Sequence, residues 1–342
     1  MEDLNSLKPL LLYTMTSGLG DFIVMGDLMR KIEELVPEAR CFIAHRGNPH
    51  VRLWRKDDYP ERFYDVYKPS QFFKLITRLK RVRKEGYTGF GLQMAPGSLQ
   101  GFFFHTFLKK IKAIDFTVDF NLINADIITS PKGNYILDLH LNQVKDLLKI
   151  DIPEDFYKLE LPTGNEDFKN QTNNNRKRIG IHPWSRRGDL PCFAWPFENW
   201  MEVIKFLLGR KEHEIVIFGR DGKFEDFRAY MYERVNSSSR IKFVPCNSVK
   251  ELITIVKSLD LLLSVNTSVV HIGYALGKKM IILSGPSLDL WTPRGENIII
   301  INDDKAIFSG SDKYINDARF PSVSKIAPKS LLSSISLILG KQ

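Results

Sequence analysis

Residues 261–277 read LLLSVNTSVVHIGYALG, and this pattern decides the class of fold. The apolar run 261–265 has the length of a strand that is buried on both faces, as in a parallel sheet. A polar break at 266–268 follows at once. From Val269 onward the apolar residues take helical spacing, and Gly277 stands where a helix commonly ends. The stretch therefore predicts a strand, a tight turn and a helix.

The turn after this strand is a candidate anion site. It leaves backbone N–H groups at a helix N-terminus, with the hydroxyls of Thr267 and Ser268 beside them, and such a place attracts phosphate. His271 lies about one helical turn further along and can reach the same point. A second strand, 280–283, ends in the small polar loop 284–287 at the same sheet edge. Two such strand ends form the crevice where open α/β sheets bind ligands.

The rest of the chain divides into two α/β halves. Residues 9–15, 22–36 and 41–44 predict a strand, a helix and a second strand, an order that implies a parallel sheet. A second series of strands and helices begins at residue 178 and includes the stretch above. Between the halves, residues 163–178 contain only one large apolar residue, as a linker does. We therefore expect two successive Rossmann-like domains.

The turn before the first helix contains Gly18, Gly20 and Asp21. The two glycines allow a close backbone turn, and Asp21 is a plausible N-cap, a structural role that would explain it fully. The turn lacks the third glycine of a dinucleotide-binding fingerprint, which argues against a nicotinamide dehydrogenase. An acid at such a turn can instead deprotonate an acceptor hydroxyl.

Composition and charge limit the class of protein. A chain of 342 residues is long enough for two domains, and its net charge of +9 favours nucleotides, phosphorylated substrates or an anionic membrane face. The alternative explanation is that the charge only keeps the protein soluble. No nucleic-acid-binding motif accompanies the charge. The three cysteines are far apart and match neither a metal site nor a disulfide framework. No apolar run reaches the roughly 18–20 residues of a membrane span, and no signal peptide is visible, so we expect a cytoplasmic protein.

Two segments of the first half combine basic and aromatic residues. Residues 71–84 predict an amphipathic helix with six Lys or Arg, and residues 101–112 predict a helix rich in phenylalanine that ends in lysines. Packing on a core is the ordinary explanation of both. The functional alternative is contact with a phosphorylated acceptor or with anionic headgroups, as peripheral attachment to the inner membrane would need.

Several short motifs together resemble glycosyltransferase family 9, the heptosyltransferases of lipopolysaccharide core assembly. Each motif is weak alone, but their order and spacing are specific. In chain order they are GLGD at 18–21, YTGFGLQM at 87–94, IHPWS at 181–185, WPFENW at 195–200, IVIFG at 215–219, NTSVVH at 266–271, ALG at 275–277 and SGP at 284–286.

The resemblance implies a GT-B fold, in which two Rossmann-like domains face a cleft. It implies an N-terminal acceptor domain at 1–165, a linker at 166–177 and a donor nucleotide-sugar domain at 178–322. The last segment, 323–342, would be a helix that crosses back to pack on the N-terminal domain.

The resemblance also implies an inverting, metal-independent glycosyltransferase without a cofactor. It would transfer a heptose-like sugar from a nucleoside-diphosphate donor, such as ADP-heptose, to a lipopolysaccharide core or similar phosphorylated glycan. Asp21 matches the catalytic base of the family. The candidate donor-binding residues are Asn266, Thr267, Ser268, His271, Ser185, Arg186, Arg187, Gly219, Glu225 and Gly285. The candidate acceptor-binding residues are Gly18, Gly20, Gln93 and Ser98.

The chain departs from the family pattern Asp-[Ser/Thr]-Gly-x-x-His at two positions. Asn266 replaces the aspartate and removes a charge, and Ser268 replaces the glycine. The Lys or Arg that often precedes Trp-Pro is also absent, and Arg186 or Arg187 would supply that cation instead. These departures leave two alternatives open: a GT-B enzyme with another donor, such as a UDP-hexose, and a non-catalytic homologue that binds nucleotide-sugars or glycans.

Overall fold

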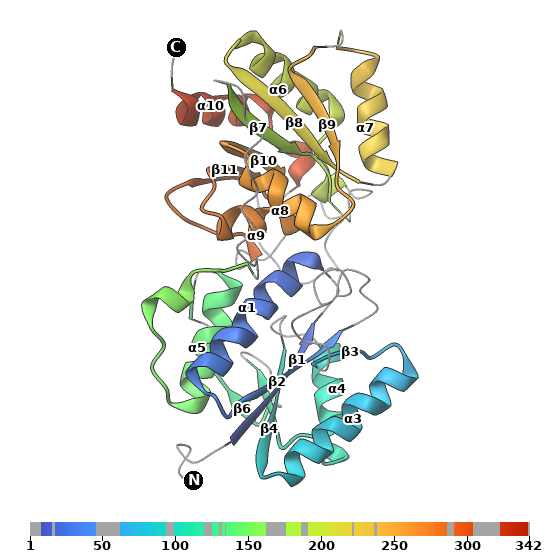
Figure 1. The fold of residues 1–342 in the computed structure, drawn as a ribbon, viewed down its shortest axis with the longest axis vertical. Coiled ribbons are helices and arrows are strands. Elements are labelled where there is room, and N and C mark those ends of the chain that lie inside the picture. Colours follow the sequence, from blue (N-terminus) through green and yellow to red (C-terminus); the bar gives the residue numbers. More distant parts are fainter. Residues whose placement is uncertain are drawn as a thin grey trace. The chain divides into compact units, whose positions relative to one another are not determined.

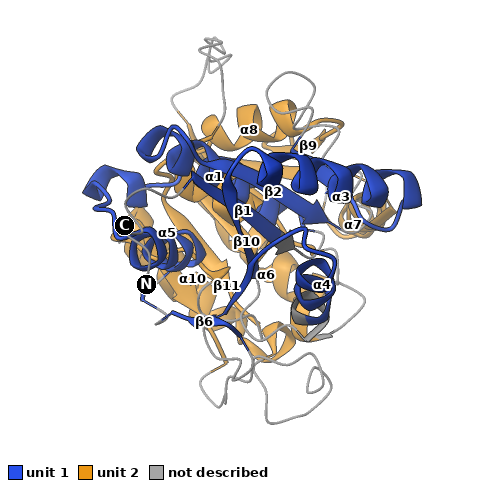
Figure 2. Ribbon diagram, turned by 90° about the horizontal axis from the view of Figure 1, so that it is seen from below, with its two compact units in different colours: residues 1–159 blue, residues 160–342 orange. Residues whose placement is uncertain are grey.

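The computed structural model of the protein forms two compact units, residues 1–159 and residues 160–342 (Figures 1 and 2). The structure describes residues 8–15, 18–45, 62–93, 99–119, 125–129, 132–133, 135–161, 176–185, 191–220, 222–235, 238–285, 291–303 and 322–340. Most of the predicted linker at 166–177 lies outside these ranges.

Unit 1 is built on a parallel sheet of six strands in the order β3-β2-β1-β4-β5-β6. The inner strand β1 (Lys8–Met15) is fully buried from Leu10 to Tyr13, as expected for a parallel strand covered on both faces. The predicted strands 9–15 and 41–44 are confirmed to within one residue. The strands are β1 (Lys8–Met15), β2 (Arg40–His45), β3 (Phe63–Asp65), β4 (Tyr87–Gln93), β5 (Phe116–Asp119) and β6 (Ile127–Ile128).

The helices of unit 1 form two pairs. α1 (Leu19–Leu35) packs against α5 (Ile136–Leu148), whereas α3 (Pro69–Lys84) contacts β3 and β4, and α4 (Leu99–Lys110) contacts β4 and β5 (Figure 1). A core of strand residues lies under α3 and α4. The helices contribute Leu75, Leu79, Val82 and Leu108 to it. The three α3 residues follow helical spacing, which gives this helix one apolar stripe and leaves its other faces to polar residues.

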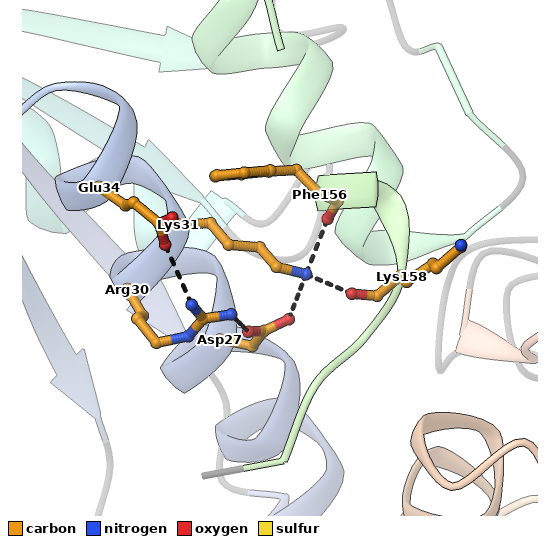
Figure 3. Close-up of polar contacts among 6 residues, drawn as sticks. All are labelled: Asp27, Arg30, Lys31, Glu34, Phe156 and Lys158. Carbon is orange, nitrogen blue, oxygen red and sulfur yellow. Dashed lines mark hydrogen bonds and ion pairs between the residues drawn. The ribbon is translucent and has the colours of Figure 1, made fainter. Parts of the chain in front are cut away.

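A buried ion pair fixes α1 to the end of unit 1 (Figure 3). Lys31 and Asp27 are 1% and 3% exposed, and the Lys31 Nζ atom lies 2.7 Å from Asp27 Oδ2. The same ammonium group donates to the carbonyl of Phe156, at 2.8 Å, and to that of Lys158. Arg30 approaches the other carboxylate oxygen of Asp27 at 2.9 Å. Both oxygens of the Asp27 carboxylate therefore have a cationic partner, as a buried charge requires.

Unit 2 repeats the architecture with a parallel sheet in the order β12-β11-β10-β7-β8-β9. The strands are β7 (Lys177–His182), β8 (His213–Gly219), β9 (Ile241–Pro245), β10 (Leu261–Val265), β11 (Met280–Leu283) and β12 (Ile298–Ile301). The helices are α6 (Phe197–Gly209), α7 (Gly222–Tyr232), α8 (Val249–Lys257), α9 (Ser268–Ala275) and α10 (Pro328–Leu339). The strand, turn and helix predicted for residues 261–277 are confirmed as β10, a two-residue turn and α9.

The C-terminal helix α10 packs against α6 within unit 2. Leu331 and Ile335 are fully buried in the core of this unit, and the indole N–H of Trp195 donates to the carbonyl of Ile326 at 2.8 Å. These contacts anchor the segment before and within α10 to unit 2. Its crossing to the N-terminal domain stays a prediction.

Within the described ranges, no helix has both the length and the apolar character needed to cross a bilayer.

Replacing Lys31 with methionine should destabilise unit 1 by about 3 kcal/mol, because Asp27 would then keep its buried charge with only a half-exposed partner. Hydrogen exchange of peptides from α1 and from residues 154–158 measures this loss in unit 1 alone. Arg30→Met is the matched control, since it removes the more exposed cation from the same carboxylate and should cost less than about 1 kcal/mol. Equal protection in the two variants would contradict the role given to Lys31.

Candidate functional site

The sheet of unit 2 has its topological switch point between β7 and β10. β7 begins the unit, the chain adds β8 on one side of it, and β10 later pairs on the other side. Ser264 is in register with His182, so both strands end at the same edge of the sheet. Residues 183–185 and 266–268 follow directly. Open α/β sheets bind ligands at such a point, and most of the predicted donor residues follow strands that end there.

Thr267 occupies the N-cap position of α9 without capping it. Its backbone is extended, with φ −148°, but its side chain makes no capping hydrogen bond. The Thr267 Oγ1 atom is buried and has no hydrogen-bond partner among the described residues. A threonine at this position usually accepts a bond from the first turn of the helix. The predicted site at Thr267 and Ser268 is thus a helix N-terminus that its own N-cap side chain leaves uncovered.

Asn266 is fixed by a hydroxyl from a later loop. Its Nδ2 donates to Thr292 Oγ1 at 2.7 Å, and Thr292 Oγ1 lies 3.4 Å from Ser284 Oγ. Thr292 and Ser284 are 2% and 3% exposed, so the network joins the ends of β10 and β11 in a buried setting. Thr292 was missed by sequence reasoning, because no motif connects it with a residue so far upstream.

Two buried histidines lie near the switch point, one on each strand–helix unit. His271 lies within α9, and burial lowers its pKa to about 4. Burial also lowers the pKa of His182 to about 4, and the ring of this residue lies 5.4 Å from that of Trp184 and 5.5 Å from that of Phe218. Both imidazoles are therefore neutral at pH 7, so each has one donor and one acceptor nitrogen.

The two predicted donor-side glycines are explained by close packing. A Cβ atom on Gly219 would lie 2.1 Å from the ring of Trp184, and one on Gly285 would lie 2.2 Å from the carbonyl oxygen of Cys192. Neither approach is compatible with a side chain. The glycines therefore let Trp184 and the residue 192 turn lie against the ends of β8 and β11, whether or not a ligand is bound.

The loop after β7 is contacted by a cation from α7 that the sequence did not reveal. The Lys223 Nζ atom, in the first turn of α7, donates to the carbonyl of Ser185 at 3.3 Å. Ser185 Oγ donates to the carbonyl of Phe193, also at 3.3 Å. The strand–loop–helix pattern at residues 213–232 could have revealed Lys223. The predicted cations Arg186 and Arg187 lie outside the described residues.

Glu225 does not stand out as a ligand residue. It is exposed on α7 and forms an ion pair with Arg228 of the same helix.

In unit 1, Asp21 lies in the first turn of α1 and is oriented by the backbone. The prediction that Asp21 is the N-cap is wrong, because the helix begins at Leu19 and Gly18 is the N-cap. The backbone N–H of Gly18 donates to Asp21 Oδ2 at 3.0 Å. A glycine has no side chain with which to cap the helix, and Asp21 reaches back to the N-cap N–H, as the third residue of a capping box does.

The sheet of unit 1 has its own switch point between β1 and β4. Thr14 is in register with Gln93, so the turn before α1 and the end of β4 share one sheet edge. The predicted acceptor residues Gly18, Gly20 and Gln93 therefore belong to one edge by backbone position. The side chain of Gln93 and all of Ser98 lie outside the described residues.

No group of three or more His, Cys, Asp or Glu side chains that could hold a metal ion occurs in the described part of the chain.

The family resemblance inferred from the motifs is confirmed by comparison with known proteins. The family model of glycosyltransferase family 9 (heptosyltransferase) matches residues 78–313, which is more than half of the chain. No curated protein matches the sequence.

Several solved structures share the fold across both units, which confirms the predicted α/β fold of GT-B class. One is a family 9 glycosyl transferase from Veillonella parvula, with 16% identity, TM-score 0.70, and 99% of this chain and 98% of that chain covered. Another is the ADP-heptose lipopolysaccharide heptosyltransferase II of E. coli, with 15% identity, TM-score 0.61, and 97% and 98% covered. The E. coli heptosyltransferase WaaC, solved with ADP, has 14% identity, TM-score 0.62, and 96% and 99% covered.

The stability of unit 2 should fall as the pH falls from about 6.5 to about 4. His182 and His271 have a pKa of about 4 in the folded chain, whereas unfolded histidines titrate near 6.5, so the unfolded state binds more protons in this window. The expected slope reaches about 1.4 kcal/mol per pH unit for each histidine, and the stability is fully present above pH 6.5.

Urea unfolding followed by tryptophan fluorescence measures this slope, because Trp184, Trp195 and Trp200 all lie in unit 2. His271→Gln should flatten the dependence, since it removes one of the two titrating groups. A free energy of unfolding that stays constant from pH 7 to pH 5 would refute the assignment.

Proposed function

The chain belongs to glycosyltransferase family 9, and from this membership we propose that it transfers a heptose-like sugar from a nucleoside-diphosphate donor to a lipopolysaccharide core or similar glycan. Unit 2 would bind the donor and unit 1 the acceptor. Two of the structures with a similar fold are solved with ADP or with an ADP-linked fluoroheptose, which supports an ADP-linked donor here as well. We expect the reaction to take place in the cytoplasm, with inversion at the anomeric carbon and without a metal.

The uncapped N-terminus of α9 is the observation that carries the donor site. Thr267 stands at the N-cap, yet its hydroxyl has no partner among the described residues, and rotation about its Cα–Cβ bond would let it donate to a phosphate oxygen. The helix N-terminus adds the partial positive charge that favours a diphosphate. Lys223 of α7, whose ammonium group contacts the loop after β7, would add a cation. Together these groups can stabilise the leaving diphosphate as its charge develops.

Asn266 and His271 suit recognition of the sugar by neutral groups. Asn266 is held by Thr292, so its amide has a fixed orientation, and it carries no charge to repel a phosphate beside it. His271 is uncharged at neutral pH and can exchange hydrogen bonds with hydroxyl or phosphate oxygens. A carboxylate at position 266 could only accept hydrogen bonds, whereas the amide both donates and accepts. The enzyme can therefore prefer a different donor sugar from the one bound by family members that have an aspartate at this position.

Asp21 is the proposed general base. Its carboxylate would take the proton from an acceptor hydroxyl as that oxygen attacks the anomeric carbon and the bond from this carbon to the diphosphate oxygen breaks. The bond from Gly18 N–H fixes the side chain at the sheet edge that carries the other acceptor residues.

Thr267→Val should weaken binding of nucleoside diphosphate about tenfold or more, because a hydrogen bond to a charged phosphate is lost. Calorimetric titration with ADP, UDP, GDP and ADP-heptose in EDTA measures this effect and the nucleotide preference together. Stability should not fall, since the hydroxyl has no partner to lose within the described residues.

Thr254→Val is the matched control for this experiment. Thr254 donates to a carbonyl of its own helix α8 and should leave donor affinity unchanged. Preference for UDP would support a glycosyltransferase that uses a UDP-linked donor instead of an ADP-linked one. Absence of binding to all four compounds, or a requirement for added divalent metal, would contradict the proposed site.

Asp21→Asn should lower turnover about a hundredfold to ten-thousandfold while donor affinity stays as in the wild type. The amide oxygen of asparagine can still accept from Gly18 N–H, so the start of α1 should remain folded. Asp138→Asn, in the first turn of α5 in the same unit, is the control and should retain activity. Near wild-type turnover in Asp21→Asn, with donor binding intact, would rule out this base. Binding without transfer or donor hydrolysis in the wild type would instead identify a non-catalytic homologue.

A further inference from the structure

Helix α3 has an exposed stripe that begins with an aromatic ring and ends with lysines. Phe73, Lys80 and Lys84 are seven and then four positions apart, a spacing that puts them on one side of a helix. Phe73 is 65% exposed, and both lysines are exposed as well. The apolar face of α3, with Leu75 and Leu79, is already buried in the core, so burial on the sheet does not account for Phe73.

Helix α4 repeats the same arrangement. Phe103 and Phe107 are four positions apart and Lys110 follows three later, so they share one side of the helix. Phe103 is 66% exposed and Phe107 is 44% exposed. Two exposed stripes in one unit thus have the same order, with phenylalanine toward the helix N-terminus and lysine toward the C-terminus.

The two helices are joined at their aromatic ends. The ring of Phe72 lies 5.8 Å from that of Phe73, 6.2 Å from that of Phe104 and 6.1 Å from that of Phe107. α3 and α4 contact neighbouring strands of the same sheet (Figure 1). The exposed rings of Phe73 and Phe107 therefore belong to one aromatic cluster, and Phe103 lies one helical turn from Phe107 on the same side of α4.

The charge around this cluster has one sign. α3 carries six Lys or Arg and α4 carries two, and neither helix contains an Asp or Glu. The nearby acids Glu85, Asp115 and Asp126 pair with Arg81, Arg83 and Lys109, respectively. Within the described residues, Lys80, Lys84 and Lys110 form no ion pair. An occupant of this surface must therefore be apolar at its centre and negatively charged at its edge.

We propose that α3 and α4 form a docking surface for an anionic lipid bilayer. The exposed phenylalanines would enter the boundary between headgroups and acyl chains, and the lysines at the C-terminal ends of both helices would contact anionic headgroups. The bilayer is the partner whose chemistry matches both parts of the surface, since aromatic side chains are stable at the membrane interface and lysines are attracted to its negative potential. This surface uses none of the residues of the donor site, so it can be tested separately from catalysis.

Co-sedimentation of the full chain with vesicles tests the surface. Vesicles of phosphatidylcholine with about one-third phosphatidylglycerol, and without any glycan, should bind the wild type, and pure phosphatidylcholine should bind it much less. Binding should weaken in high salt because the headgroup attraction is screened. Phe73→Ser with Phe103→Ser should reduce binding at least tenfold, and Lys80→Ala and Lys84→Ala should each reduce it about fivefold.

Matched substitutions in unit 2 provide the controls. Tyr232→Ser removes an aromatic side chain that is 63% exposed, and Lys205→Ala removes an exposed lysine, and both should bind vesicles as the wild type does. Asp21→Asn should also bind normally, because the vesicles carry no acceptor. Unchanged circular dichroism and donor affinity would show that the phenylalanine variants are folded. The proposal is overturned if the wild type ignores anionic vesicles, if the unit 2 variants lose binding equally, or if light scattering shows a dimer that the phenylalanine variants abolish.

Discussion

Burial of both faces of each parallel sheet is the constraint on which the rest of the structure depends. The central strands β1 and β10 are buried and mainly apolar, because helices cover both faces of each sheet, and the hydroxyl of Ser264 within β10 donates to backbone carbonyls. The polar side chains of the candidate sites lie at the strand ends and in the loops that follow. At the C-terminal edge of unit 2 this places Asn266, Thr267 and Ser284 near one another, and in unit 1 it places Asp21 and Gln93 at one edge. The candidate functional residues therefore lie where each sheet ends.

The same constraint explains how much the sequence could predict. The apolar run before residue 266 and the helical spacing after it identified β10 and α9 nearly to the residue, because each depends on local pattern alone. The start of α1 was placed three residues late, since a glycine N-cap gives no side-chain signal and Asp21 satisfies it from the third helical position. Thr292 could not be found at all, because its contact with Asn266 depends on how two distant loops meet.

The burial of the Asp27–Lys31 ion pair is another feature that the sequence could not predict. An Asp and a Lys four positions apart on a helix usually form an exposed pair of little consequence. The sequence alone does not distinguish Asp27 and Lys31 from such a pair. The structure buries both side chains and gives the ammonium group two backbone carbonyls as further partners. Whether a charged pair is a surface detail or an anchor is decided by the segment that packs over it, here residues 154–158.

This anchor has a mechanical consequence. Lys31 holds the carbonyls of Phe156 and Lys158, which are among the last residues of unit 1 before the chain continues to unit 2. Tension applied to the chain beyond residue 158 reaches α1, whose first turn contains Asp21, through the Lys31 ammonium group, and it reaches α5 through the hydrogen bond from the Tyr157 hydroxyl to Asn142. The contact with Asp27 lies within α1, so it braces the ammonium group without bearing this load, which falls on the contacts with the carbonyls of Phe156 and Lys158.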